Sequence, residues 1–121
     1  MESFKLPFAE IKVIHHNIAE VIIDEGIEMD LSIVKQYHDF LLTHLSAPFS
    51  LLINKINAYS YTFEAQVELA TLKEINAMAV VTYNNQTKAA TQYLAKLPRD
   101  KPWHLEMFTD RSIALNWLTQ Q

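Results

Sequence analysis

Phe49-Ser50-Leu51-Leu52-Ile53-Asn54-Lys55-Ile56 is the stretch from which the fold can be worked out. It opens on a nearly continuous apolar run, which is typical of a strand that is covered on both faces, as in a parallel sheet. Ser46-Ala47-Pro48 precedes it and ends the element before it, because proline disfavours helical backbone in the residue that it follows. We therefore expect a buried strand over residues 49–56 that is entered directly from a helix.

Helices are predicted on both sides of this strand. Upstream, residues 31–45 carry apolar side chains on one face, and Asp30 is placed to cap the first turn with its carboxylate. Downstream, Thr62 can cap a second helix whose apolar residues run from Phe63 to Leu72. The central strand is therefore expected between two amphipathic helices.

The same alternation of strands and helices continues toward the carboxyl end. Residues 75–83 form an apolar run typical of a strand, and Asn84-Asn85-Gln86-Thr87 offers caps for a third helix that Pro98 ends. Alternating side chains over residues 103–108 predict a fifth strand. Asp110 is the expected cap of a last helix that reaches Leu118.

A hairpin is predicted at the amino end. Phe8 to Ile14 and Ile18 to Ile23 are short runs rich in β-branched residues, separated by the polar turn His15-His16-Asn17. Gly26, the one glycine of the chain, is expected to accept a positive φ where the second strand ends. The order β-β-α-β-α-β-α-β-α predicts an α/β fold: a single-layer, mostly parallel five-stranded sheet with an N-terminal antiparallel hairpin. With 121 residues, of which 50% are apolar, we expect one domain over 1–121.

Composition excludes several classes of protein. The absence of cysteine excludes disulfides and thiolate metal sites, and fits a reducing compartment, so we expect a cytoplasmic protein. The first residues show no secretion signal, and no apolar run approaches the ~18 residues of a membrane span. The net charge of -4 provides no global field for nucleic acid. We therefore predict neither a nucleic-acid partner nor a membrane span.

No catalytic, cofactor or metal residue is predicted, and we expect a protein that is not an enzyme. A single glycine cannot supply a phosphate loop, a dinucleotide-binding fingerprint or a nucleophile elbow. No two of the five histidines have the i, i+4 spacing that turns two imidazoles toward one metal. Ser60 has no base beside it in sequence to activate it as a nucleophile.

The chain resembles the STAS or SpoIIAA-like family of anti-sigma-factor antagonists, and more closely the small bacterial proteins grouped with it. The resemblance spans residues 10–118. It is carried by the element order, by the strand residues 51–54 leading into 60–65, and by the closing segments 108–110 and 114–118. It implies a SpoIIAA-like fold and a regulatory module that interacts with a protein partner.

The resemblance also implies a switch at the loop before the second helix. In anti-sigma-factor antagonists a serine of this loop is phosphorylated by a partner kinase to break a protein complex, and Ser60 or Thr62 is the matching hydroxyl here. Tyr59 and Tyr61 flank the serine, where the family usually has Asp and Gly nearby. Ser60 and Thr62 are therefore the candidate phosphorylation or partner-binding residues.

The alternative is a small-molecule or lipid-binding module. Tyr59, Tyr61 and Tyr83 are expected near the carboxyl ends of the strands, where ligands bind in open α/β sheets, and they are the candidate rim of a pocket. A homodimer is a further expectation, formed either through a sheet face that helices leave bare or through the edge of the hairpin.

Overall fold

The predicted N-terminal hairpin is present, and a strand that was not expected extends it. The computed structural model describes residues 2–121. β2 (Ala9–His15) and β3 (Ile18–Ile23) pair antiparallel, and β1 (Glu2–Leu6) adds to the outer edge of β2. β1 has only two partly buried residues, so its hydrophobic pattern is too weak to predict it. The main sheet of the described chain therefore has six strands instead of the predicted five.

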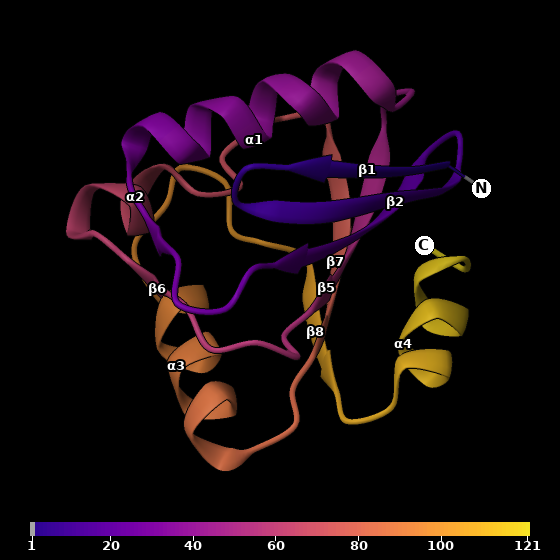
Figure 1. The fold of residues 1–121 in the computed structure, drawn as a ribbon. Coiled ribbons are helices and arrows are strands. Elements are labelled where there is room, and N and C mark those ends of the chain that lie inside the picture. The colour runs from indigo at the N-terminus through magenta and orange to yellow at the C-terminus, as the bar shows by residue number, and fades with distance from the viewer. Residues whose placement is uncertain (1) are drawn as a thin grey trace.

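The other half of the sheet is parallel, as predicted. β5 (Phe49–Asn54) lies beside β3, β7 (Ile75–Val81) beside β5, and β8 (Leu105–Phe108) beside β7. The spatial order is β1-β2-β3-β5-β7-β8 (Figure 1). Because parallel neighbours end at the same edge, the loops that follow β5, β7 and β8 gather at one side of the molecule.

Each helix begins at a cap that the sequence offers, and Asn84 is the cap among the candidates at residues 84–87. α1 (Leu31–His44), α2 (Phe63–Glu68), α3 (Asn85–Ala95) and α4 (Arg111–Leu118) start after side chains that each accept a backbone N–H three residues on, namely Asp30, Thr62, Asn84 and Asp110. α2 ends earlier than its apolar pattern suggests, because Ala70 takes a left-handed backbone with φ of 54°. Among residues 2–121, no helix is long and apolar enough to cross a membrane.

A short parallel pair ties two loops together near the carboxyl ends of the strands. β4 (Glu28–Met29) pairs with β6 (Ser60–Tyr61), and neither was predicted. Gly26 has the expected positive φ, 78°, and its N–H donates to the carbonyl of Ala58 at 2.8 Å. The segments that follow β3 and β5 are therefore held side by side.

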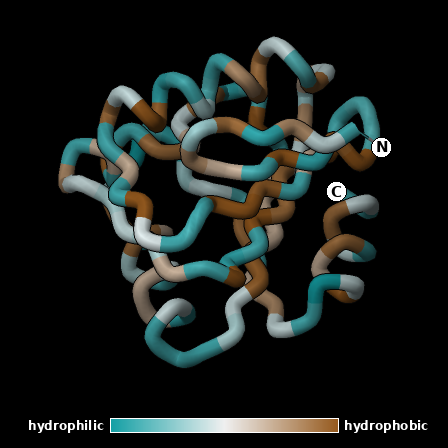
Figure 2. Tube along the Cα trace, viewed as in Figure 1, coloured by the Kyte–Doolittle hydropathy of each residue, from teal (hydrophilic) through white to brown (hydrophobic). Residues whose placement is uncertain are grey.

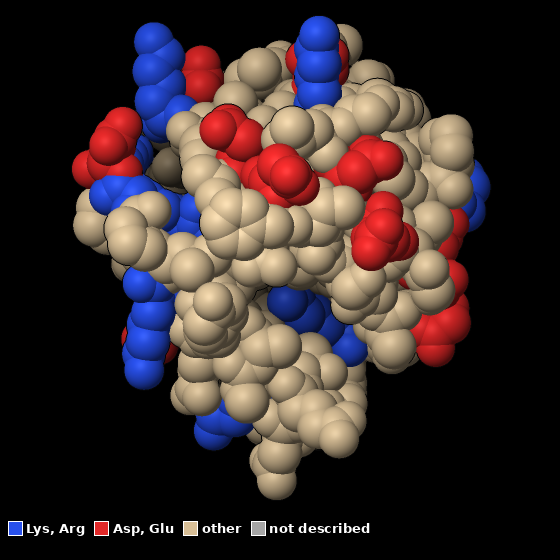
Figure 3. Space-filling model, turned by 90° about the vertical axis from the view of Figure 1, so that its left-hand side faces the viewer, with Lys and Arg blue, Asp and Glu red and all other residues tan. Residues whose placement is uncertain are grey.

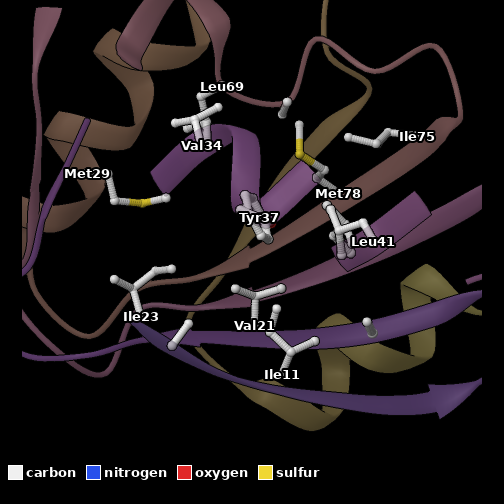
Figure 4. Close-up of a cluster of buried hydrophobic side chains, with 14 of the residues drawn as sticks. Ile11, Val21, Ile23, Met29, Val34, Tyr37, Leu41, Leu69, Ile75 and Met78 are labelled. Atoms are coloured by element: carbon white, nitrogen blue, oxygen red, sulfur yellow. The ribbon is translucent and has the colours of Figure 1, made fainter. Parts of the chain in front are cut away.

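Two hydrophobic cores lie on opposite faces of the sheet. The larger one packs α1 against β2 and β3, and Figure 4 shows Tyr37 in its middle, between side chains of the helix and of the strands. The smaller one lies under α4, over β5 and β7. Figure 2 shows the same distribution, with hydrophobic residues concentrated on the central strands and hydrophilic residues on the outer turns.

An ion pair fastens α4 to the sheet beside the smaller core. Glu20 of β3 is 1% exposed, and its carboxylate accepts from Arg111 at 2.9 Å from Nε and 2.7 Å from Nη2. Asn54 donates to the same carboxylate at 2.9 Å, and the Tyr83 hydroxyl donates to Asn54 at 2.7 Å. Burial alone would raise the pKa of the Glu20 carboxyl, but the hydrogen bonds from Arg111 and Asn54 outweigh it and hold that pKa below its usual value. The carboxylate is therefore ionised.

Arg111→Met should lower the free energy of unfolding by about 1–3 kcal/mol, because it leaves the buried Glu20 carboxylate without its cation while Asn54 still donates to it. The matched control is a surface pair: Lys5 contacts Asp24 at 2.6 Å with 60% of its side chain exposed. Lys5→Met should cost less than about 1 kcal/mol. Urea unfolding at pH 7 measures both losses, and equal losses would contradict the importance of the buried pair.

Candidate functional site

Tyr59 and Tyr61 lie close together and turn their rings toward the larger core. Their rings meet edge to face with centroids 5.5 Å apart, and the Tyr61 hydroxyl donates to the Tyr59 hydroxyl at 3.2 Å. Tyr37 of α1 lines a small cavity together with Tyr59 and Tyr61. Burial raises the pKa of all three hydroxyls, to about 12 for Tyr61. They are therefore protonated at neutral pH and can act as hydrogen-bond donors.

Tyr83 does not join these two tyrosines. Successive side chains of a strand point to opposite faces of the sheet, so Asn54 faces the α4 side while Lys55, the next residue, faces the α1 side. Tyr83 bonds to Asn54 and belongs to the Glu20 and Arg111 cluster. The expected group of three tyrosines is thus divided between the two faces.

Ser60 and Thr62 differ in how far their hydroxyls are already used. Thr62 Oγ1 accepts from the N–H of Ala65 at 3.2 Å as the cap of α2. Ser60 is exposed at the surface, while its backbone N–H donates to the carbonyl of Ile27 at 3.0 Å. Ser60 is therefore the more accessible of the two, and modification of either residue stays a prediction.

Lys55 is the residue at this site that sequence reasoning missed. It follows β5 directly, is 9% exposed, and places Nζ 5.5 Å from the Tyr59 ring centroid and 5.8 Å from that of Tyr61. Within residues 2–121, Nζ has no ion pair or hydrogen bond. Burial lowers its pKa to about 8. Its burial could have been predicted from its position, because this lysine continues the inward-facing row of residues of an apolar strand.

Lys55 lies between a small apolar cavity and a larger groove. The cavity, about 40 Å³, is lined by apolar side chains together with Tyr37, Tyr59 and Tyr61. The groove, about 440 Å³, runs between the loop after β5 and α3. Both are lined by Lys55, Tyr59, Tyr61 and Leu94, so these side chains separate the two spaces. Figure 3 views the side of the molecule that carries β6 and α3 and shows a hollow with basic side-chain atoms inside it.

Hydrogen bonds fix the far wall of the cavity. The N–H of Ala70 donates to Nε2 of His38 at 3.1 Å, and Trp103 Nε1 donates to the carbonyl of Ala70 at 3.1 Å. The Arg99 guanidinium stacks on the Trp103 ring at 3.8 Å and donates to carbonyls at the ends of α2 and α3. Burial lowers the pKa of His38 despite nearby Glu68 and Asp39, so its neutral ring is the acceptor. The wall is therefore preformed.

The chemistry of the site is that of one cation among protonated hydroxyls and apolar surface. Lys55 is the one charged residue among the described residues that line the groove. No group of three or more His, Asp or Glu side chains in residues 2–121 could hold a metal ion. The ammonium of Lys55 donates hydrogen bonds and cannot accept them, so the matching ligand group is an acceptor such as a carboxylate or carbonyl oxygen.

Lys55→Met should stabilise the protein at pH 7 by about 1–3 kcal/mol, because it removes a buried charge and keeps the volume of the side chain. The lowered pKa means that the unfolded chain binds more protons between pH 8 and 10.5, so the penalty for Lys55 shrinks as the pH rises through this window. Urea unfolding of both chains should therefore show a smaller difference at pH 9.5 than at pH 7. A difference that does not change with pH would contradict a lowered pKa.

Comparison of the chain with models of protein families, with curated proteins and with solved structures gives no significant match. The arrangement of the strands shows an α/β fold with a mixed sheet, in which an antiparallel N-terminal hairpin precedes parallel strands. Because one fold can host many functions, the function of this chain depends on the chemistry of its site.

Proposed function

We propose that this protein is a non-enzymatic module that binds a small molecule with one anionic group and an apolar body. The observation that carries the proposal is Lys55, a residue that is 9% exposed and whose ammonium lines an open groove without a counterion among residues 2–121. The groove lies at the carboxyl ends of β5 and β7, where open α/β sheets bind their ligands.

A carboxylate would supply the counterion that Lys55 lacks. A largely desolvated cation without a counterion costs free energy, and an anion placed against it recovers part of that cost. Tyr59 also lines the groove, and its hydroxyl accepts from Tyr61 and still has its own proton to donate. A charge-assisted hydrogen bond to a carboxylate is about twice as strong as a neutral one. Polar recognition of the ligand therefore centres on Lys55.

Size and charge narrow the class of ligand. A groove of about 440 Å³ falls within the range of small-molecule sites, roughly 300–1,000 Å³. A single cation in the lining matches one negative charge rather than a polyphosphate. Figure 3 also shows a group of acidic side chains on the neighbouring surface, which would repel a polyanion. We infer a monocarboxylate with a short hydrocarbon or aromatic body.

A second candidate function, partner switching of the STAS or SpoIIAA-like type, is supported by the position of Ser60. This exposed serine lines the same groove as Lys55. A phosphate on Ser60 would bring about two negative charges to this surface and change which partner it accepts. In this proposal the loop before α2 binds a protein, and modification of Ser60 releases it.

Titration with hexanoate and with hexanamide, followed by ¹H–¹⁵N NMR, tests the ligand proposal. Hexanoate should shift the amide signals of Lys55, Tyr59, Tyr61 and Leu94, and hexanamide should bind at least about tenfold more weakly, because a hydrogen bond to a charged group contributes about 1.5–3 kcal/mol. Lys55→Met should lose this preference for the carboxylate.

Lys35→Met is the matched control, since Lys35 is exposed on α1 and does not line the groove. It should bind hexanoate as the unchanged protein does. Equal affinity of the unchanged protein for hexanoate and hexanamide, or unchanged hexanoate binding in Lys55→Met, would contradict the proposal.

A further inference from the structure

The amine of Lys55 is placed for a covalent reaction as well as for charge pairing. We propose that Lys55 captures small aldehydes as a reversible imine, because its Nζ lies between an open groove and an apolar cavity and has no carboxylate to hold it. This reaction goes beyond the binding of an anion, although the aldehyde would reach Lys55 through the same groove as the proposed anionic ligand.

Access and surroundings both favour such a reaction. The groove that leads to Lys55 is large enough for a small aldehyde, and the adjoining cavity of about 40 Å³ offers apolar contacts to its tail. The rings of Tyr59 and Tyr61 flank the amine at 5.5 and 5.8 Å. A cation over an aromatic ring is stabilised, and the protonated imine is again a cation. The product therefore keeps the contacts that the ammonium makes.

The reaction balances without an oxidant or a reductant. The lone pair of Nζ attacks the carbonyl carbon, a C–N bond forms, and the electron pair of the C=O π bond moves to oxygen. A proton passes from nitrogen to that oxygen, which gives a carbinolamine. The C–O bond then breaks as solvent protonates the oxygen, water leaves, and the nitrogen lone pair forms the C=N bond of the protonated imine. Addition of water reverses each step.

Selectivity for Lys55 comes from the neutral fraction of its amine. Lysines desolvated in apolar pockets are the ones that proteins use as nucleophiles. With a pKa of about 8, about one Lys55 in ten is neutral at pH 7. An ordinary exposed lysine is neutral in about one molecule in 3,000. The excess of neutral amine is large enough to outweigh the lower nucleophilicity of a less basic nitrogen.

Reductive trapping on the unchanged protein tests the proposal without any need for a variant to fold. Hexanal, present in less than one equivalent, is added at pH 7 with sodium cyanoborohydride, and the hexylated lysines are mapped by peptide mass spectrometry. Lys55 should be labelled at least about tenfold faster than exposed Lys35. The rate at Lys55 should rise with pH and level off above about pH 8, where its amine is largely neutral.

Labelling of Lys55 at the rate of Lys35 or more slowly across pH 6–9 would overturn the proposal. The Lys55→Met variant measures hexylation of the other lysines, which should be the same as in the unchanged protein. The two proposals for this groove fail separately. Hexanoate that does not bind while Lys55 is still labelled contradicts the anion site alone, and hexanoate that binds while Lys55 is not preferentially labelled contradicts imine capture alone.

Discussion

The alternation of side chains at the end of β5 is the constraint on which the site depends. Asn54 points to the α4 face and completes the cluster with Glu20, Arg111 and Tyr83, while Lys55 points to the α1 face. The charged residues on the two faces of the sheet have different surroundings. Glu20 is buried with its cation and an amide donor, whereas Lys55 is buried against aromatic rings with no counterion among residues 2–121. The second arrangement costs stability and leaves a donor available to a ligand.

The rest of the fold holds this arrangement in place. Pairing of β4 with β6 and the cap at Thr62 fix the segment that carries Tyr59 and Tyr61, so their rings stay near Lys55. On the far side, Arg99 and Trp103 tie the ends of α2 and α3 to the wall of the cavity. A site supported in this way needs little rearrangement on binding, and less of the binding energy is lost to ordering it.

Local sequence signals predict the scaffold better than the site. The helix caps at Asp30, Thr62, Asn84 and Asp110, the antiparallel hairpin and the parallel strands all follow from short-range patterns, and the structure confirms them. β1 and the β4–β6 pair were missed because strands with so few buried residues carry almost no periodic signal. Lys55 was missed because a lysine is usually exposed. Its burial depends on Tyr59 and Tyr61 folding back over it and on α3, which is distant in sequence.

Direct titration of the Lys55 ammonium tests whether this amine is desolvated and unpaired. Heteronuclear NMR of ¹³C,¹⁵N-lysine-labelled protein follows the Cε and Nζ signals from pH 6 to 11, and Lys55→Met assigns the signal that belongs to Lys55. The burial of Lys55 predicts that its ammonium titrates with a pKa of about 8, below the ordinary lysine value of 10.5. Titration of Lys55 near 10.5 would show that its amine is solvated or paired, and would contradict a desolvated ammonium at this site.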